Sequence, residues 1–301
     1  MSLSSQLDSD VQPGPGAQFN HNNKSTYCDY NDAFTVYDQF RRTHGLQSIL
    51  NIFQQSDVPL EEQIVLEGGF GTGAYLDKIR HHVKKMYGVE GSDEGYQQTQ
   101  KKINNAANVN LQIGNILRLP FHENFFHGYL VNQVLHHLDH KNNFQELDVF
   151  LAESNRVLKS GGHLAINTCS QEQLDPEQSP YWHYKYIPNA ARSMQRQFIP
   201  IEELAARLKS AGFDEIKRSI PSGKVFQKGY YENPYIGLQP EFRRGDSAYS
   251  FLSTAELDES NVRLREAIED GSVHRLMKHV AERAQEIGEV VIISARKMPQ
   301  I

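Results

Sequence analysis

A turn with glycine at every second position constrains this chain more than any other segment. An apolar run ends at Glu67, and Gly69, Gly71 and Gly73 then lead into the helix-like residues 74–79. Glycine permits a sharp turn with positive φ and lets a ligand lie against the main chain without an intervening Cβ. The start of a helix adds free N–H groups. The loop therefore predicts a site for a cofactor that contains a nucleotide.

The spacing of the glycines argues against a dinucleotide. A dinucleotide fingerprint requires G-x-G-x-x-G to hold a pyrophosphate, whereas Gly73 comes one residue too early. Glu67 also stands where it would repel a phosphate, and it suits the cationic amino group of a cofactor with a charged tail instead. An NAD-dependent reductase is therefore a distant alternative.

Composition excludes several other classes of protein. The 31 basic and 37 acidic residues give a formal charge of -6, so the chain has no electrostatic footprint for a nucleic-acid backbone. Two cysteines, Cys28 and Cys169, cannot make a disulfide framework, and no apolar run approaches the roughly 20 residues that span a bilayer. The N-terminus lacks the apolar core of a secretory signal. We expect a cytoplasmic protein that binds neither nucleic acid nor membrane.

Strand and helix patterns alternate along the chain from residue 63 onward. The expected strands are 63–67, 85–90, 109–114, 127–132, 162–168, 215–220 and 289–296, and the expected helices are 46–55, 73–83, 93–106, 141–158 and 200–209. Such alternation indicates an α/β fold with helices on both faces of a parallel sheet. Ligands then bind at the carboxyl ends of the strands, where the strand order reverses.

Four sequence blocks, in this order, identify a family. They are VLEGGFGTG at 65–73, YGVEGS at 87–92, GNILRLPF at 114–121 and RVLKSGGHL at 156–164. With these blocks, residues 64–168 resemble the class I S-adenosylmethionine (SAM)-dependent methyltransferases, in particular their small-molecule branch. The resemblance implies a SAM cofactor and a Rossmann-like, doubly wound, seven-stranded, mostly parallel sheet with an antiparallel last strand and helical lid insertions.

The remaining segments are assigned around this core. Residues 1–25 are polar and rich in Ser, Gln, Asn, Gly and Pro, so we expect a disordered tail. Residues 26–301 are expected to form a single methyltransferase domain. Its expected parts are N-terminal lid helices at 26–60, the cofactor-binding core at 61–168, substrate-lid insertions at 169–199 and 222–287, and the last strand at 289–297.

The cofactor site is expected along the glycine loop and the following strand ends. Glu90 comes 23 residues after Glu67, where a carboxylate accepts hydrogen bonds from both ribose hydroxyls. Asn115 stands where similar enzymes usually carry an Asp for the adenine amino group; its amide oxygen still accepts that bond, but the charge is gone. The predicted cofactor-binding residues are Glu67, Gly69, Gly71, Gly73, Glu90, Gly91, Asn115, Ile116, Asn132, Tyr37 and Arg41.

An aromatic stripe precedes the core. Tyr30, Phe34, Tyr37 and Arg41 recur at three- and four-residue steps, which predicts one face of a helix. The helix either packs on the domain or closes over the cofactor as a lid. In the second case Tyr37 and Arg41 face the site, and Arg41 meets the carboxylate of the cofactor.

Candidate catalytic residues follow the fourth expected strand. Methyl transfer mainly requires the nucleophile to be held in line with the activated carbon, and a general base is needed only if the nucleophile carries a proton to remove. Asn132 and His136 are the predicted catalytic residues. The alternatives are that His136 only shapes the pocket and that Asn132 is a polar residue of the core.

Substrate binding is expected in the aromatic segment 180–198, which holds the only tryptophan. Aromatic faces attract a cationic amine or sulfonium, although such a cluster can also be a small core of its own. Nearby arginines could clamp a carboxylate or face solvent. The predicted substrate-binding residues are Tyr27, Tyr30, His136, His183, Tyr184, Tyr186 and Arg196.

No metal site is expected. Enzymes that methylate arsenite bind it through several thiolates, and a metal-dependent catechol enzyme would need a cluster of acids after the fourth strand. The leading hypothesis is methyl transfer to a small polar metabolite with an N, S or O acceptor. A protein or RNA methyltransferase and a non-catalytic SAM-binding protein are the alternatives, because fold does not fix function.

Overall fold

The computed structural model describes residues 30–104, 106–139 and 143–299, with side chains from Ala33 onward. The expected tail at 1–25 and Tyr27 lie outside this range, as does the side chain of Tyr30.

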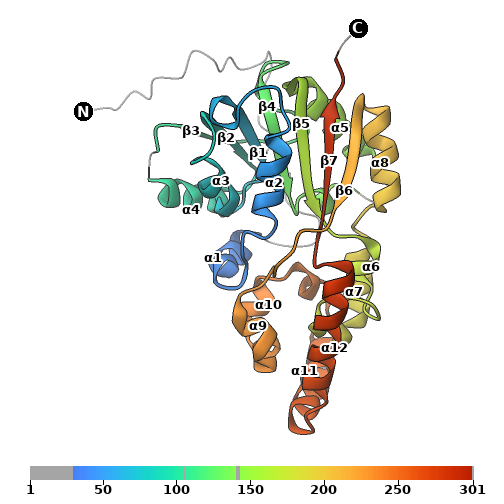
Figure 1. Cartoon of the computed structure of the whole chain (residues 1–301). Helices are drawn as coiled ribbons and strands as arrows, with labels where there is room; N and C mark the ends of the chain where they lie inside the picture. Colours follow the sequence, from blue (N-terminus) through green and yellow to red (C-terminus); the bar gives the residue numbers. More distant parts are fainter. Residues whose placement is uncertain (1–29, 105, 140–142, 300–301) are drawn as a thin grey trace, which may run out of the picture.

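A seven-stranded sheet forms the centre of the molecule (Figure 1), in the order β3-β2-β1-β4-β5-β7-β6. The strands are β1 Ile64–Gly68, β2 Lys85–Glu90, β3 Val109–Ile113, β4 Phe126–Asn132, β5 Leu158–Thr168, β6 Phe213–Ser219 and β7 Val291–Lys297. Strands β1 to β5 are mutually parallel, whereas β7 runs antiparallel to both of its neighbours. The strand order reverses between β1 and β4, so their carboxyl ends border the expected ligand crevice. The predicted fold class is confirmed.

The helices of the structure are more numerous than those predicted from periodicity, because the helices within 169–199 and 222–287 had no predicted bounds. They are α1 Tyr30–Phe40, α2 Leu46–Phe53, α3 Ala74–Ile79, α4 Asp93–Ile103, α5 Gln145–Val157, α6 Gln171–Leu174, α7 Pro188–Gln195, α8 Ile201–Ser210, α9 Lys228–Glu232, α10 Pro240–Arg244, α11 Thr254–Glu269 and α12 Ser272–Ile287, with 3-10 turns η1 Leu60–Glu62, η2 Leu135–His137, η3 Trp182–Lys185, η4 Pro234–Leu238 and η5 Ser247–Phe251. β5 begins earlier than expected, because Leu158 already pairs with Phe126 before a bulge in β5.

Helices cover both faces of the sheet. Apolar residues of α2 and α3, including Phe53 and Leu76, are buried against one face. Phe150 of α5 and Leu204 of α8 are buried against the other. α2 therefore belongs to the cover of the sheet, and within the expected lid segment 26–60 only α1 lies over the ligand side.

The two chain segments expected as insertions fold together into one helical cap. η3, α7 and α9 to α12 gather below the sheet in Figure 1. Trp182, Tyr230 and Phe242 are fully buried in an apolar core that is distinct from the two cores flanking the sheet. The cap thus has a core of its own and extends beyond the carboxyl ends of the strands.

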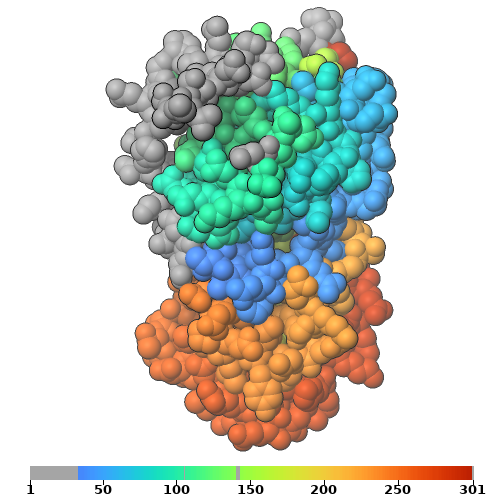
Figure 2. All heavy atoms as spheres, turned by 90° about the vertical axis from the view of Figure 1, so that its left-hand side faces the viewer, coloured from blue at the N-terminus to red at the C-terminus, as the bar shows by residue number. Residues whose placement is uncertain are grey.

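α1 lies between the sheet and the cap. Figure 2 shows it in dark blue, with the α4 side of the sheet domain above it and the orange part of the cap below. It contacts α4 on one side and α10 on the other. No helix in the described part of the chain is long and apolar enough to span a bilayer.

Candidate active site

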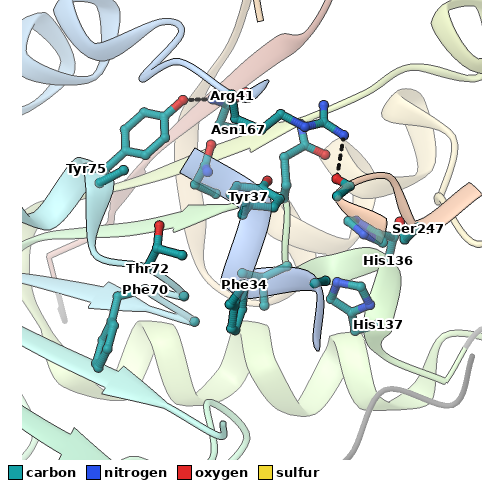
Figure 3. A pocket seen from close by; sticks show the side chains of 18 of the residues that line it. Phe34, Tyr37, Arg41, Phe70, Thr72, Tyr75, His136, His137, Asn167 and Ser247 are labelled. Carbon is teal, nitrogen blue, oxygen red and sulfur yellow. Dashed lines mark hydrogen bonds between the residues drawn. The ribbon is translucent and has the colours of Figure 1, made fainter. Parts of the chain in front are cut away.

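One cavity of about 930 Å³ lies at the carboxyl ends of the parallel strands, under α1 and the cap (Figure 3). It has two parts. The outer cleft follows the sheet and is lined by Glu67, Gly69, Phe70, Gly71, Thr72, Glu90, Gly91, Ser92, Asp93, Gly114, Asn115 and Ile116. The inner chamber reaches toward the cap and is lined by Tyr37, Arg41, His44, Tyr75, Asn132, Gln133, His136, Asn167, Cys169, Tyr181, Tyr184, Met194, Phe198, Phe226, Gly245, Asp246 and Ser247.

The glycine loop forms the floor of the outer cleft. Gly69 and Gly71 have φ angles of 67° and 51°, in the left-handed region that favours glycine. A Cβ on Gly69 would lie 2.6 Å from Val134 Cγ2, and a Cβ on Gly71 would lie 3.1 Å from the ring of Phe34. Glycine at these positions therefore lets the loop pack closely against Val134 and Phe34.

Two carboxylates end β1 and β2 at this cleft. Glu90 accepts hydrogen bonds from the backbone N–H groups of Gly71 at 2.7 Å and Ser92 at 2.9 Å. Glu67 is buried, and its Oε2 has no hydrogen-bond partner among the described residues. Burial and the charge of Glu90 raise the pKa of Glu67 well above its ordinary value. A buried carboxylate in this state would be stabilised by a cation.

The far end of the cleft is formed after β3. Asn115 lines it, and its side-chain oxygen accepts a hydrogen bond from Leu117 N at 2.9 Å, which fixes the turn. Ile116 is buried beside it and presents an apolar wall. Asn132, at the end of β4, has a buried side-chain oxygen without a partner in the described part of the chain. An unpartnered polar acceptor therefore remains at the end of β4, on the chamber side of the cavity.

α1 closes the cleft from above. The Thr72 hydroxyl donates a hydrogen bond to Asp38 at 2.6 Å, and Lys102 of α4 pairs with the other oxygen of Asp38 at 2.6 Å. Tyr37 and Arg41 lie on the side of α1 that lines the inner chamber (Figure 3). The helix thus contacts the glycine loop and the cap at once, as a lid would.

Two histidines follow β4 on η2. His136 is buried, lies against His137 with ring centroids 3.9 Å apart, and stacks on Phe198 at 4.4 Å. Burial, and less strongly the neighbours His137 and Arg41, lower the pKa of His136 well below its ordinary value. Burial lowers the pKa of His137 to about 3. Both imidazoles are neutral and weakly basic near pH 7.

The thiol in the chamber is also poorly suited to act as a nucleophile. Cys169 is buried, and its Sγ lies 3.7 Å from the Gln133 amide and 4.0 Å from the Tyr181 hydroxyl. Burial raises the pKa of Cys169 to about 11. It stays a neutral thiol near pH 7, whereas nucleophilic attack requires a thiolate.

Most of the predicted cofactor-binding residues line the cavity. Only some of the predicted substrate-binding residues do. His136 and Tyr184 line the chamber. His183 instead lies behind it in the cap core, where its ring nitrogens contact Tyr230 and Asp246. Tyr186 packs on that core, and Arg196 is exposed and bonds Ser193. The structure therefore places His183, Tyr186 and Arg196 away from the chamber lining, whereas the sequence predicted them to bind the substrate.

The short helical turn η3 accounts for the positions of His183 and Tyr186. It directs Tyr181 and Tyr184 to the chamber and Trp182 and His183 to the cap core. Gly73 likewise does not line the cavity; its φ of 71° and its close approach to Thr99 position the start of α3.

Several chamber residues were missed. Asn167 lies at the end of β5 and Cys169 directly follows that strand, so their position at a strand end could have identified them. Phe226, Asp246 and Ser247 come from the second insertion, which has no motif that would single them out before the cap is folded. Within the described residues, no group of three or more His, Cys, Asp or Glu side chains is arranged to hold a metal ion.

Comparison with known proteins agrees with this geometry. Residues 66–166, which contain the glycine loop, Glu90 and strands β2 to β4, match the methyltransferase domain family. This part of the chain is a methyltransferase domain, and the fold is that of the class I SAM-dependent methyltransferases.

Two solved structures show the same fold. A protein provisionally described as a methyltransferase from an antibiotic biosynthesis pathway of Anabaena variabilis superposes with a TM-score of 0.68 at 18% identity, over 86% of this chain and 99% of the other. The geranyl diphosphate C-methyltransferase of Streptomyces coelicolor gives a TM-score of 0.51 at 14% identity, over 84% of this chain and 78% of the other.

One curated relative is similar in sequence. It is an uncharacterised 37.1 kDa protein of transposon TN4556 from Streptomyces fradiae, 23% identical over 221 residues. The match covers 72% of this chain and 62% of the relative.

The residues of this methyltransferase fit SAM. The unpartnered Oε2 of Glu67 is a buried acceptor suited to the ammonium group of the cofactor's methionine part. Gly69 and Gly71 leave main chain open to the cofactor, and Glu90 at the end of β2 is suited to ribose hydroxyls. SAM is the cofactor of this fold, and the predicted residues Glu67, Gly69, Gly71 and Glu90 line one cleft.

Proposed function

We propose that this methyltransferase transfers the methyl group of SAM to a small polar metabolite, at an amine nitrogen or a thioether sulfur. The observation that carries the proposal is the continuity of the outer cleft with the inner chamber in one cavity of about 930 Å³. A cavity of this size suits a cofactor together with a small molecule.

The position of the chamber favours a small acceptor over a macromolecule. α1 and the cap cover it, and Asp38 and Arg41 attach α1 to the glycine loop and to the cap respectively. A protein side chain or an RNA base would need this cover to open widely. The formal charge of -6 gives no attraction for RNA.

The basicity of the site favours an acceptor that is already nucleophilic. A hydroxyl acceptor needs a base to remove its proton at the transition state. Burial lowers the pKa of both His136 and His137, so neither is an effective base for a hydroxyl. A neutral amine or a thioether needs no such base.

SAM supplies the activated methyl group, and the protein's residues contribute position. Asn132, Gln133 and Asn167 offer amide groups around the strand ends, where they orient a polar acceptor. Phe198 and Phe226 give the chamber apolar walls, and α1 excludes water when it lies over the site.

Incubation with methyl-labelled SAM tests this function. The enzyme is supplied in separate reactions with a small-metabolite extract, with tRNA and with a protein extract, and labelled products are identified by mass. We expect label in a metabolite at nitrogen or sulfur. Label only in tRNA or protein would reject the small acceptor, and binding of SAM without any transfer would favour a non-catalytic role.

A further inference from the structure

Arg41 is anchored by the cap. Its guanidinium lies 4.1 Å above the ring of Phe226, and its Nη2 lies 3.5 Å from Asp246 Oδ2 and 3.4 Å from Gly245 O. By contrast, the contacts of α1 with the glycine loop are made by Phe34 and Asp38. Arg41 therefore belongs to the chamber side of the lid.

Asp246 is fully engaged by other groups. Its Oδ1 accepts a hydrogen bond from Ala248 N at 3.1 Å, and its Oδ2 lies 3.2 Å from His183 Nε2. His183 is held in turn by the Tyr230 hydroxyl at 2.9 Å. Burial alone would raise the pKa of Asp246, but His183 and Arg41 hold it at about 2. Asp246 is thus a fixed anion that orients Arg41 from behind.

Arg41 still has N–H groups that can donate hydrogen bonds to a ligand. A guanidinium has five N–H groups, and the bonds recorded for Arg41 both use Nη2 at long distances. Its Nε is buried without a hydrogen-bond partner among the described residues. A buried donor without a partner destabilises the protein. An acceptor group entering the chamber could relieve that cost.

A second cavity connects Arg41 with the outside. This cavity is open, has a volume of about 740 Å³, and shares Asp38, Arg41, Arg42, His44 and Ala74 with the main cavity. Arg42 and Lys224 also line it, and Lys224 pairs with Glu289 at 3.4 Å. Asp38 is the one acidic residue among those that line this second cavity, and it is paired with Lys102. The mouth that leads to Arg41 is therefore cationic.

We infer that the methyl acceptor carries a carboxylate and that Arg41 binds this carboxylate in the inner chamber. The inference rests on the proposed function. A planar carboxylate matches the fork of a guanidinium. A phosphate dianion would be repelled more strongly by Asp246 and by the buried acids of the outer cleft. A substrate ammonium is disfavoured because Arg41 already occupies the face of Phe226.

Calorimetry on the enzyme saturated with S-adenosylhomocysteine (SAH) tests the inference. The probes are 4-aminobutyrate, histidine and 3-phenylpropionate, each paired with its primary amide, and phenyl phosphate. Wild type is compared with Arg41→Gln and with the control Arg275→Gln, an exposed arginine on α12. We expect at least one acid to bind about tenfold or more tightly than its amide, the scale of a charged hydrogen bond. Arg41→Gln should remove this preference, and Arg275→Gln should retain it.

The outcomes separate this inference from the proposed function. If no acid binds more tightly than its amide, if Arg41→Gln keeps the preference, or if phenyl phosphate binds more tightly than 3-phenylpropionate, the carboxylate assignment is wrong. If Arg41→Gln weakens SAH binding about tenfold and leaves the acid preference unchanged, Arg41 serves the cofactor instead. A wild-type protein that binds SAH but transfers no methyl group in any labelled reaction would reject the proposed function whatever the probes show.

Discussion

The hydroxyl of Thr72 donates a hydrogen bond of 2.6 Å to Asp38, which joins the glycine loop directly to the lid helix α1. Lys102 holds the other oxygen of the same carboxylate from α4. One turn earlier, the ring of Phe34 lies against Gly71. The position of α1 over the cavity therefore depends on its contacts with the glycine loop.

Replacing Asp38 with alanine should loosen the lid. One lost hydrogen bond corresponds to about 0.5–1.5 kcal/mol, so the Kd of SAH should rise about two- to tenfold. Hydrogen exchange should also become faster in α1. Asp258→Ala, at an exposed position on α11, is the matched control. Unchanged SAH affinity and unchanged exchange in α1 would show that this contact does not hold the lid.

Glu67→Gln should weaken cofactor binding and stabilise the cofactor-free protein. One oxygen of the buried carboxylate, Oε2, has no hydrogen-bond partner in the described chain, and loss of a charged hydrogen bond to the cofactor should cost about 1.5–3 kcal/mol. Because burial raises the pKa of Glu67 above its ordinary value of 4.5, the folded protein binds more protons than the unfolded chain between the two pKa values. The stability of the cofactor-free protein therefore falls as the pH rises from about 4.5 through the raised pKa.

Thermal unfolding and calorimetry check this prediction. At pH 8, Glu67→Gln should have a higher Tm than the wild type without cofactor and a weaker affinity for SAM. Glu259→Gln, exposed on α11, should change neither. A Glu67→Gln protein that binds SAM as tightly as the wild type would show that this carboxylate does not meet the cofactor.

The fold could be predicted because its signals are local. The glycine loop and the alternating strand and helix patterns each lie within short segments, and their order determines a doubly wound sheet. The residues of the outer cleft follow directly, since Glu67, Glu90, Asn115 and Asn132 all come at or just after strand ends.

The cap could not be predicted in the same way. Its core joins Trp182, Tyr230 and Phe242, which are brought together only when two distant chain segments fold on one another. The sequence placed His183 in a substrate cage, whereas the 3-10 turn directs it to Asp246. The sequence pattern of residues 180–198 does not tell which side chains of that turn face the core of the cap and which face the chamber.

Asp246→Ala should destabilise the protein by about 3–5 kcal/mol, because it leaves Arg41 largely buried without its carboxylate. Since His183 and Arg41 hold the pKa of Asp246 at about 2, compared with an ordinary value of 3.8, its stabilising contribution is present above 3.8 and is lost as the pH falls through about 2. Urea unfolding at pH 7 measures the loss. Asp214→Ala, at an exposed position of β6, should stay within about 0.5 kcal/mol of wild type.

His136→Gln should lower the rate of methyl transfer less than about tenfold and leave its pH profile unchanged, because a histidine of strongly lowered pKa is not the general base. His279→Gln on the exposed side of α12 should have no effect. A loss of about 100-fold or more with a new pH dependence would identify His136 as a base and favour a hydroxyl acceptor.

Calorimetric titration of the purified protein with SAM, SAH and NAD tests the central claim most directly. We expect SAM and SAH to bind at one site and NAD not to bind. Glu90→Ala should weaken SAH binding by about 1–3 kcal/mol, the cost of charged hydrogen bonds left unmade. Binding of NAD without SAM, or SAH binding that is unaffected by Glu90→Ala, would contradict the assignment of this cleft.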